Sequence, residues 1–470
     1  MDHERFADHL AAPEGRGDPP PGAHDGAAGG AVCGDLIRVS VRVDGDRIDA
    51  VSFDASGCGA VTAAGSAVVT LVQDALLLDA ARVGTREIAD ELGGLSPGKL
   101  HAAELAADAL HRALGLAAGD AALDFDPRRT LVAMSGGVDS AVAALLVGRA
   151  GRSAVAVTLE LWADPANDAE ASCCSAHAVR VARSLAHRMG MPHLTLDLRS
   201  DFRAGVVDPF LAGYAGGETP NPCVGCNGHV RLDAMIELAD RLGAADLATG
   251  HYARLSGGLL RAAADPAKDQ TYMLAALAPE SLARLRFPLC ELTKPEVRAL
   301  AAEAELPVAS KADSMDLCFL AGTGKAAFLA RHAGLEDREG EIVSASGDVL
   351  GRHAGFHHYT VGQRRGLGLQ SPEPLYVLRT EARANRVVVG TRAELATSRV
   401  RLRGARLHRP DDEVDAVRLR YHSRAVPCRV VRGSAGVELE LGEAFLGAAP
   451  GQAAQLLRGD VVVGWGTITR

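Results

Sequence analysis

The sequence predicts a multidomain protein with an N-terminal α+β domain, a central doubly wound α/β domain with a parallel sheet, and small antiparallel β domains at the C-terminus. Three observations predict this. Apolar and polar residues alternate from Leu36 to Phe53, and an Ala- and Leu-rich stretch with helical spacing follows over 62–116. Strands then alternate with helices of about 10–15 residues over 130–255. From about residue 340, short strands separated by Gly, Pro and Asp predominate.

The elements follow in chain order. The N-terminal alternation turns at Asp44-Gly45, which is typical of a β-hairpin. In the central unit LVAM is a short buried strand, and further strands are expected at 153–162, 193–198 and 246–255. The predicted divisions are a disordered Gly/Pro/Ala-rich leader at 1–30, an N-terminal domain at 31–120, a central domain at 128–330, a middle β domain at 331–395 and a C-terminal β-barrel-like domain at 396–470.

Composition and charge argue against a membrane-spanning or secreted protein and leave nucleic-acid binding possible for part of the chain. The chain has 470 residues, is 47% hydrophobic, and contains no apolar run long enough to span a bilayer. Nine scattered cysteines and an N-terminus without a signal-peptide core indicate a reducing, cytoplasmic location. The net charge is −9, but residues 1–120 alone carry −10 and the remainder +1. The remainder is therefore free to present a basic face to a nucleic acid.

The stretch SGGVDS, between a buried strand and a helix, predicts an ATP site. Two glycines let the backbone approach a ligand closely, and the helix N-terminus presents free N–H groups to an anion. There is no Walker Lys, and the stretch resembles the PP-loop of ATP pyrophosphatases. This implies ATP, with Mg²⁺, as the cofactor. The predicted binding residues are Ser135, Gly136, Gly137, Val138, Asp139 and Ser140, together with Leu159 and Gly250.

The stretch TPNPCVGCN holds Cys223 and Cys226 in a Cys-x-x-Cys. Such a pair is compatible with half of a zinc site, a redox disulfide, a cluster anchor or a catalytic thiol pair. Zinc normally needs a second pair at fixed spacing, and none is evident in the sequence.

Three further motifs, taken with the two stretches above, resemble those of a known enzyme family. DPAKDQTYML (265–274), SKADSMDLCFLA (310–321) with Cys318, and GRHAGFHHYTVGQRRGLGL (351–369) follow SGGVDS and TPNPCVGCN in order. Together they resemble the tRNA-specific 2-thiouridylase family from about Arg129 to Arg470. The resemblance implies a sulfurtransferase that adenylates the C2 oxygen of the tRNA wobble uridine and replaces it with sulfur. It also implies tRNA contacts by Lys268, Gln270, Arg364 and Arg365.

The same resemblance implies that Cys318 carries a persulfide and that Cys226 then closes a disulfide with it. Many family members have Asp where this chain has Cys223, so the general base stays undefined. A [4Fe–4S] cluster held by Cys223, Cys226 and Cys318, with an open iron that carries sulfide, is the alternative. Cys173-Cys174 is compatible with a sulfur relay or with ordinary thiols.

Residues 31–118 resemble the IscU/SufU/NifU-type scaffold family through VCGDLIRVSVRVDGDRI, FDASGCGAVTAAGS and KLHAAELAADAL. Cys33, Asp35 and Cys58 match its ligands for metal, sulfur or a cluster. The third cysteine should follow His101, where this chain has Ala102, so the site lacks one ligand unless His101 joins it. The resemblance implies a cysteine desulfurase or another sulfur donor as partner. A decayed structural module is the alternative.

Two other functions compete with tRNA thiolation. One is an Fe–S scaffold or sulfur-carrier protein in which the PP-loop half is regulatory, and Ala102 argues against it. The other is a PP-loop ligase that acts on a small metabolite, and the terminal β domains argue against that.

Overall fold

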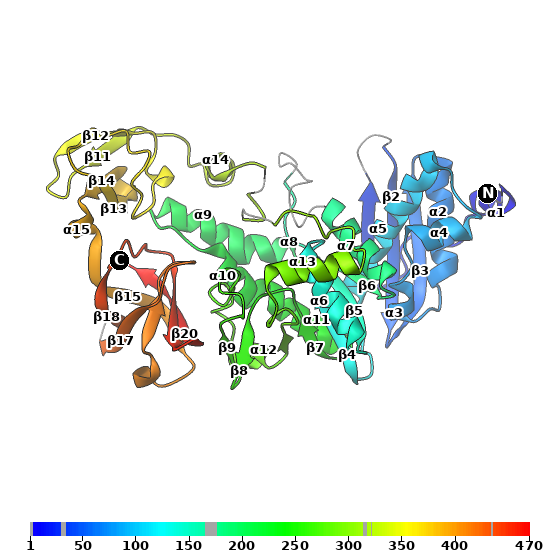
Figure 1. Ribbon diagram of the computed structural model, residues 1–470. Helices are drawn as coiled ribbons and strands as arrows, with labels where there is room; N and C mark the ends of the chain where they lie inside the picture. The colour runs from blue at the N-terminus through cyan, green and yellow to red at the C-terminus, as the bar shows by residue number, and fades with distance from the viewer. Residues whose placement is uncertain (1–2, 30–33, 165–175, 314–316, 321, 434–435) are drawn as a thin grey trace.

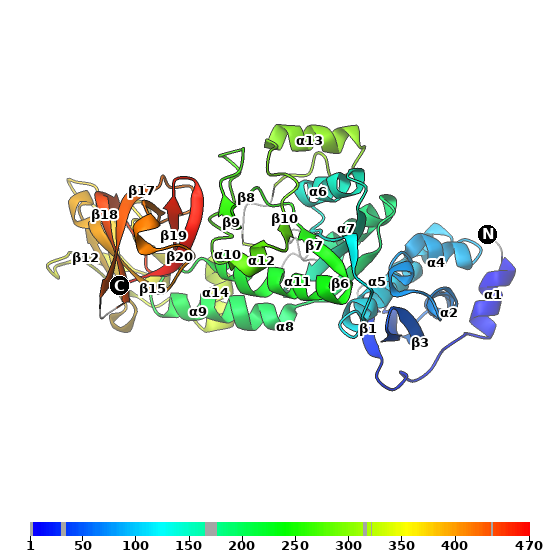
Figure 2. The ribbon, with the colours of Figure 1, turned by 90° about the horizontal axis from the view of Figure 1, so that it is seen from below.

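The computed structural model describes residues 3–29, 34–164, 176–313, 317–320, 322–433 and 436–470. The chain is arranged in a row (Figures 1 and 2). The N-terminal domain lies at one end, the central α/β domain in the middle and the β domains at the other end. Within the described residues, no helix combines the length and the apolar character needed to cross a membrane.

The N-terminal domain packs helices on one antiparallel sheet of order β1-β2-β3. Its elements are α1 (His3–Ala11), β1 (His24–Gly29), β2 (Leu36–Asp44), β3 (Arg47–Ser56), α2 (Gly59–Val72), α3 (Leu77–Ala80), α4 (Thr85–Glu91) and α5 (Leu100–Ala117). The predicted hairpin is β2–β3, with Gly45 at φ 64° in its turn.

The prediction of a disordered leader at 1–30 is wrong for the described residues 3–29. This stretch contains α1 and β1, and β1 pairs with β2 along its whole length. The small residues that suggested disorder allow close packing instead. A Cβ on Gly26 would lie 2.0 Å from the Ala109 carbonyl oxygen of α5. Composition alone could not distinguish a strand that is pressed against a helix from a flexible tail.

The central domain is built on a parallel sheet of order β10-β7-β4-β5-β6. Its strands are β4 (Asp126–Ala133), β5 (Ser153–Glu160), β6 (His193–Asp197), β7 (Ala244–Ala248) and β10 (Leu285–Arg286). The order reverses between β4 and β7, and ligands bind at the carboxyl ends of the strands at such a point. Its helices are α6 (Val138–Arg149), α7 (Ala176–Arg188), α8 (Arg199–Phe202), α9 (Asp208–Ala215), α10 (Pro222–Cys226), α11 (Leu232–Arg241), α12 (Pro279–Leu282), α13 (Lys294–Glu303) and α14 (Lys325–Ala333).

The strand expected at 246–255 is only partly correct. β7 ends at Ala248, and 249–253 form a loop. β8 (Arg254–Ser256) and β9 (Leu259–Arg261) then join the sheet of the C-terminal domain through β20. The apolar pattern continues across this break, so it could not show that the chain leaves one sheet for another.

Two β domains complete the chain. The middle sheet has the order β12-β11-β14-β13, from β11 (Gly340–Val343), β12 (Val349–His353), β13 (Tyr376–Glu381) and β14 (Arg386–Gly390), and β11–β14 is its parallel pair. After α15 (Arg392–Leu395) the last domain contains β15 (Ala396–Leu407), β16 (Ala416–Arg418), β17 (Val426–Gly433), β18 (Gly436–Leu446), β19 (Ala453–Arg458) and β20 (Val461–Thr469). Pairing of β15 with both β18 and β20 closes this sheet into a barrel.

The N-terminal domain packs on the edge strand β6 through α5. A Cβ on Gly115 would lie 1.8 Å from the Thr195 carbonyl oxygen, so only glycine permits this approach. Asp108 of α5 accepts hydrogen bonds from Arg180 and Arg183 of α7, at 2.8 and 2.6 Å. His193 is fully buried at this interface and bonds Thr158 at 2.9 Å. Shared core packing therefore joins the two domains.

This interface predicts a dependence of stability on pH. Burial, reinforced by His111 and Arg183, lowers the pKa of His193 well below its usual range. The His193 imidazole therefore binds a proton near pH 6.5 in the unfolded chain but stays neutral in the folded protein at that pH. We expect the free energy of unfolding to fall as pH decreases below about 6.5. Calorimetry at pH 7.5 and 5.5 should show a smaller decrease in Tm for His193→Gln than for the wild type, and equal decreases would contradict this assignment.

Candidate functional site

The stretch Ser135–Ser140 connects β4 to the N-terminus of α6. Gly136 has φ 68°, and a Cβ there would lie 2.9 Å from the Ala178 carbonyl oxygen. The Ser135 amide donates to the Ser140 hydroxyl oxygen at 3.1 Å, so the loop folds back onto the first turn of the helix. Val138 is buried and anchors this turn. The arrangement presents backbone N–H groups and the positive end of the helix dipole to an anion.

Gly250, in the loop after β7, contacts the same helix turn. A Cβ on this residue would lie 2.8 Å from the Ser140 amide nitrogen and 2.9 Å from the Asp139 carbonyl carbon. The loops after β4 and β7 therefore meet where the strand order reverses. This brings together two parts of the predicted ATP site that are about 110 residues apart in the sequence.

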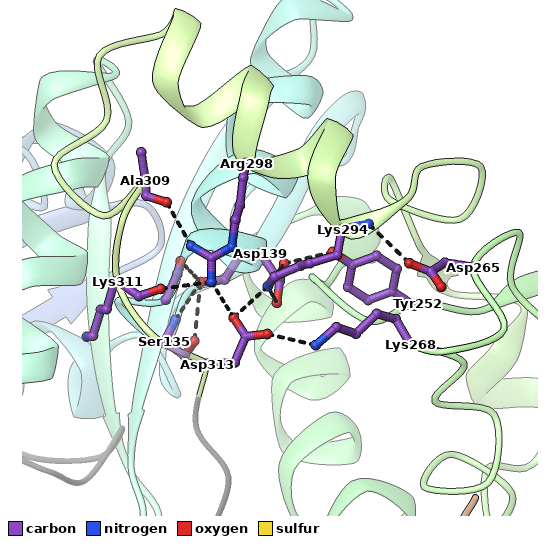
Figure 3. Close-up of polar contacts among 12 residues, drawn as sticks. Ser135, Asp139, Tyr252, Asp265, Lys268, Lys294, Arg298, Ala309, Lys311 and Asp313 are labelled. Carbon is purple, nitrogen blue, oxygen red and sulfur yellow. Dashed lines mark hydrogen bonds and ion pairs between the residues drawn. The ribbon is translucent and has the colours of Figure 1, made fainter.

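A network of charged side chains borders this loop (Figure 3). Lys294, at the start of α13, donates to the Asp139 carboxylate at 2.7 and 2.8 Å, and it also pairs with Asp313 at 2.9 Å. Asp313 further accepts from Lys268 at 2.7 Å and from Arg298 at 2.8 Å. Four chain segments thus meet in the network: α6 and the segment of Asp313 supply the two carboxylates, and α13 and the segment of Lys268 supply the cations.

Two more side chains complete the network. Lys311 donates to the Gly136 carbonyl oxygen at 2.9 Å, and the Tyr252 hydroxyl donates to Asp139 at 2.8 Å. Burial and the neighbouring Asp139 charge raise the pKa of Tyr252, so this phenol stays a donor. Burial raises the pKa of Asp313, but hydrogen bonds from Lys268 and Lys294 outweigh it and lower the value to about 2. Asp313 is therefore a carboxylate at neutral pH.

The predicted residues Leu159 and Gln270, and His251, which follows Gly250 in the sequence, have different surroundings. Leu159 lies in β5, is 7% exposed and belongs to the main hydrophobic core. Gln270 accepts from the Tyr252 amide at 3.0 Å, so it positions the residue that bonds Asp139. Burial lowers the pKa of His251 to about 3, and the ring bonds Thr249 at 2.8 Å, so it is a neutral structural histidine.

The Cys-x-x-Cys forms the short helix α10. The Asn221 side chain caps it by accepting from the Cys223 amide at 3.1 Å, and Pro222 occupies its first position. Cys226 is buried, whereas Cys223 is half-buried. The outer side of α10 at Val224 and Gly225 lines a cleft of about 530 Å³ shared with Arg403 and Trp465 of the C-terminal barrel.

Cys318 lies on the segment between α13 and α14. The adjacent Phe319 contacts Phe202 of α8 and Phe210 of α9, with ring centroids 5.8 and 5.1 Å apart. These two helices flank the π-helical turn Arg203–Val207, against which α10 also packs. The structure thus brings the segment of Cys318 and the Cys-x-x-Cys helix α10 against the same consecutive helices, which run from α8 to α9.

Mononuclear zinc does not suit these three thiols. Among the described residues, the groups whose ligand atoms all lie within 4.8 Å of one another do not include Cys223, Cys226 and Cys318 together. Zinc holds its ligands closer to one another than that. A cluster spreads its thiolates further apart, so three thiols remain a suitable donor set for it.

The N-terminal domain contains a compact ligand group. Asp35, Cys58 and His101 place their ligand atoms within 4.8 Å of one another. Asp35 accepts from the Cys58 thiol at 3.1 Å and contacts His101 Nε2 at 3.0 Å. Ala102, at the position of the missing cysteine, is fully buried. His101 therefore joins the group, as the sequence allowed. Cys33, like Cys173 and Cys174, lies outside the described residues.

A hydrogen-bonded connection joins this group to the central sheet. Arg112 of α5 holds the Glu160 carboxylate, at the carboxyl end of β5, with its closest contact at 2.7 Å. It also donates to the Ala27 carbonyl oxygen at 2.6 Å. β1 continues from Ala27 to Gly29, where a Cβ would lie 2.5 Å from the Asp35 carbonyl oxygen. The N-terminal domain therefore contacts the carboxyl end of β5 through Arg112, and β1 leads from this contact towards the segment of Asp35.

The predicted tRNA contacts form two separate groups. Lys268 and Gln270 border the phosphate loop, as described above. Arg364 and Arg365 are exposed on a turn of the middle β domain. If both groups touch one tRNA, its contact surface extends over two domains.

Sequence reasoning missed several side chains of the charged network: Tyr252, Lys294, Arg298, Lys311 and Asp313. Lys311 and Asp313 stand in the recognised stretch before Cys318, and Tyr252 stands in TGHYAR. Lys294 and Arg298 gave a weaker signal, a Thr-Lys-Pro helix start followed by an i, i+4 Arg. Only the packing of α13 over the loop reveals their role.

The fold and the site define a PP-loop α/β domain that carries an N-terminal scaffold-like domain and C-terminal β domains. Family models agree: one described as NifU-like N terminal domain matches residues 1–117, and one described as tRNA methyl transferase HUP domain matches 128–322. The tRNA methyl transferase PRC-barrel domain matches 326–391, and the aminomethyltransferase beta-barrel domain matches 396–468.

Relatives extend this agreement over the whole chain. A bifunctional protein NifU/MnmA of Rubrobacter xylanophilus is 44% identical over 99% of this chain and 98% of its own length. Proteins named tRNA-specific 2-thiouridylase MnmA from Methylorubrum extorquens and Acidithiobacillus ferrooxidans are 46% and 43% identical, each over 73% of this chain, covering 94% and 98% of the relatives. The chain belongs to the bifunctional NifU/MnmA family.

The contact between the loop after β7 and the first turn of α6 predicts that a methyl group added at Gly250 destabilises the protein. In Gly250→Ala the new Cβ would press on the backbone of α6, and we expect a loss of about 1–3 kcal/mol in the free energy of unfolding. Denaturant titration measures it. Gly433→Ala, where nothing lies within 4 Å, is the control and should change stability far less. Equal effects would show that the loop after β7 does not rest on the helix.

Proposed function

We propose that this protein is an ATP-dependent tRNA-uridine 2-sulfurtransferase that thiolates the wobble uridine. The phosphate loop with its surrounding cations, at the reversal point of the parallel sheet, is the observation that carries the proposal. Membership of the NifU/MnmA family supports tRNA as the substrate.

ATP would bind with its phosphates on the α6 N-terminus. The residues of the loop supply N–H groups, and Lys294 and Lys311 supply positive charge for the pyrophosphate that leaves. Mg²⁺ would enter the site bound to the ATP phosphates, and Asp139 is the carboxylate of the loop that would help to hold it. The ion would neutralise phosphate charge. Gly250 lets the neighbouring loop close against this turn.

The reaction proceeds in two stages. The uridine O2 attacks the α-phosphorus of ATP, and pyrophosphate leaves. A sulfur nucleophile then attacks C2, and AMP departs with the former carbonyl oxygen. A carbonyl oxygen is a poor leaving group, and adenylation converts it into a good one. The protein's contribution is to position the two reactants and to stabilise the charge that develops.

Cys318 and Cys226 supply the sulfur chemistry. In the persulfide route, the terminal sulfur on Cys318 bonds to C2. The Cys226 thiolate then attacks the Cys318 sulfur, a disulfide forms, and 2-thiouridine is released. An external dithiol reduces the disulfide for the next turnover. In the alternative, Cys223, Cys226 and Cys318 would hold a [4Fe–4S] cluster, which would supply a site for sulfide.

The N-terminal domain would supply the sulfur. Cys58 is exposed, and its thiol lies in the group with Asp35 and His101. A desulfurase could load this thiol, and the fusion then raises the local concentration of sulfur near Cys318. Lys268, Gln270, Arg364 and Arg365 would contact tRNA, the arginines through its phosphates.

Nucleoside mass spectrometry of tRNA from a thiouridylase-null bacterium tests the proposal. We expect the wild type to restore 2-thiouridine derivatives and Cys318→Ser to abolish them. Cys223→Ser separates the two routes. It should retain activity if Cys226 and Cys318 act as a thiol pair, and it should lose both iron and activity if a cluster is required.

Co-expression with a desulfurase is the control for a missing sulfur donor. Failure of the wild type under that condition would contradict tRNA thiolation and favour a scaffold protein or a PP-loop ligase of another substrate.

The role of the N-terminal domain has its own test. With purified protein, tRNA and ATP, we expect Cys58→Ser to lose activity when sulfur comes from a desulfurase and cysteine. It should keep wild-type activity when inorganic sulfide is supplied, because HS⁻ can attack the adenylated C2 directly, with AMP as the leaving group, and this route needs no N-terminal thiol. Unchanged activity with the desulfurase would contradict delivery through Cys58.

A further inference from the structure

Three metal-binding side chains meet in the middle β domain, outside the proposed reaction. Asp337, His357 and His358 each place one ligand atom within 4.8 Å of the other two. Asp337 belongs to the connection 334–339 between α14 and β11, whereas the histidines are neighbours in the 3-10 turn Phe356–His358 (η4). The group therefore joins two segments that are about 20 residues apart in the sequence.

The hydrogen bonding within the group is incomplete. Asp337 contacts His358 Nε2 at 2.7 Å, which fixes one edge of the triangle. His357 is only 3% exposed, and its Nε2 has no hydrogen-bond partner among the described residues. A polar nitrogen buried without a partner destabilises the fold, and such atoms are uncommon in native structures. This nitrogen is therefore a second observation that calls for a ligand.

We propose that Asp337, His357 and His358 bind a divalent transition-metal ion, with Zn²⁺ as the ion. Two imidazoles and a carboxylate suit Zn²⁺ and its first-row neighbours, whereas Ca²⁺ and Mg²⁺ prefer oxygen ligands alone. Three protein ligands leave a coordination position for water. Asp337 would exchange its hydrogen bond to His358 for a bond to the metal.

The position of this site indicates a structural role. Asp337 lies on the only described connection from the catalytic domain into the middle β domain, and η4 leads directly into the turn that carries Arg364 and Arg365. A bound ion would tie the connection to η4 and fix the start of that basic turn. The inference does not depend on the thiolation chemistry, because none of its three residues takes part in the proposed steps.

Zinc binding by the full-length protein tests this site directly. After equilibrium dialysis against ZnSO₄, we expect the wild type to hold one more equivalent of Zn²⁺ than Asp337→Asn or His357→Ala. Loss of a direct ligand should weaken binding by more than the roughly 10–100-fold typical of outer-shell partners. The cysteines and the Asp35 group are the same in all variants, so the difference isolates this site.

His24→Ala is the matched control, because His24 and Asp120 form a His–Asp pair of the same 2.7 Å length outside both clusters. It should bind as many equivalents as the wild type. Asp337 is exposed, so Asp337→Asn keeps the test valid if His357→Ala fails to fold. Equal zinc content in the wild type and Asp337→Asn would overturn the proposal.

Limited trypsin digestion gives an independent readout. Arg338 is exposed and adjacent to Asp337, so a metal that pins the connection should protect this bond. We expect Zn²⁺ to slow cleavage after Arg338 in the wild type and in His24→Ala but not in Asp337→Asn. The same slowing in Asp337→Asn would show that zinc acts elsewhere and would overturn the proposal.

Discussion

The ion-pair network of Lys294 with Asp139 and Asp313 is the interaction on which the proposed chemistry depends most. Lys294 is 8% exposed and is shared by two carboxylates from different parts of the chain. One carboxylate lies in the first turn of the phosphate-loop helix, and the other precedes the segment that carries Cys318. Lys294 is buried, whereas the Asp139 and Asp313 side chains are 34% and 28% exposed, so solvent partly screens the pairs, and Lys294 keeps one carboxylate partner when the other is removed. The network therefore couples the first turn of the phosphate-loop helix to the segment that leads to Cys318.

The second constraint is the rigid attachment of the N-terminal domain. Gly115 lets α5 lie directly on β6, and Arg112 bonds Glu160 and Ala27 together. A flexible tether would raise the local concentration of a sulfur carrier only on average. Here the packing of α5 on β6 and the Arg112–Glu160 contact also fix how the N-terminal domain is attached to the central sheet.

The C-terminal barrel holds the Cys-x-x-Cys from the other side. The Thr219 amide donates to the Pro450 carbonyl oxygen at 2.8 Å, and Gln452 donates to the Thr219 carbonyl oxygen at 2.7 Å. The buried Tyr272 hydroxyl donates to the Ala453 carbonyl oxygen at 2.7 Å. The helix α10 is thus held between the catalytic domain and the barrel. This gives the terminal domain a role in positioning the thiols in addition to any contact with tRNA.

The sequence by itself determined the domain order, the parallel central sheet, the phosphate loop and the scaffold residues Asp35 and Cys58, because each of these is encoded within a short local pattern. It failed at 1–30, where Gly and Ala indicate disorder unless a helix packs on them, and at 249–253, where a strand pattern continues through a loop. Only the tertiary structure decided that His101 joins Asp35 and Cys58, that Leu159 faces the core, and that Lys294 and Asp313 border the phosphate loop. These contacts join residues separated by tens to hundreds of positions, and no local pattern records which of the many possible pairs will meet.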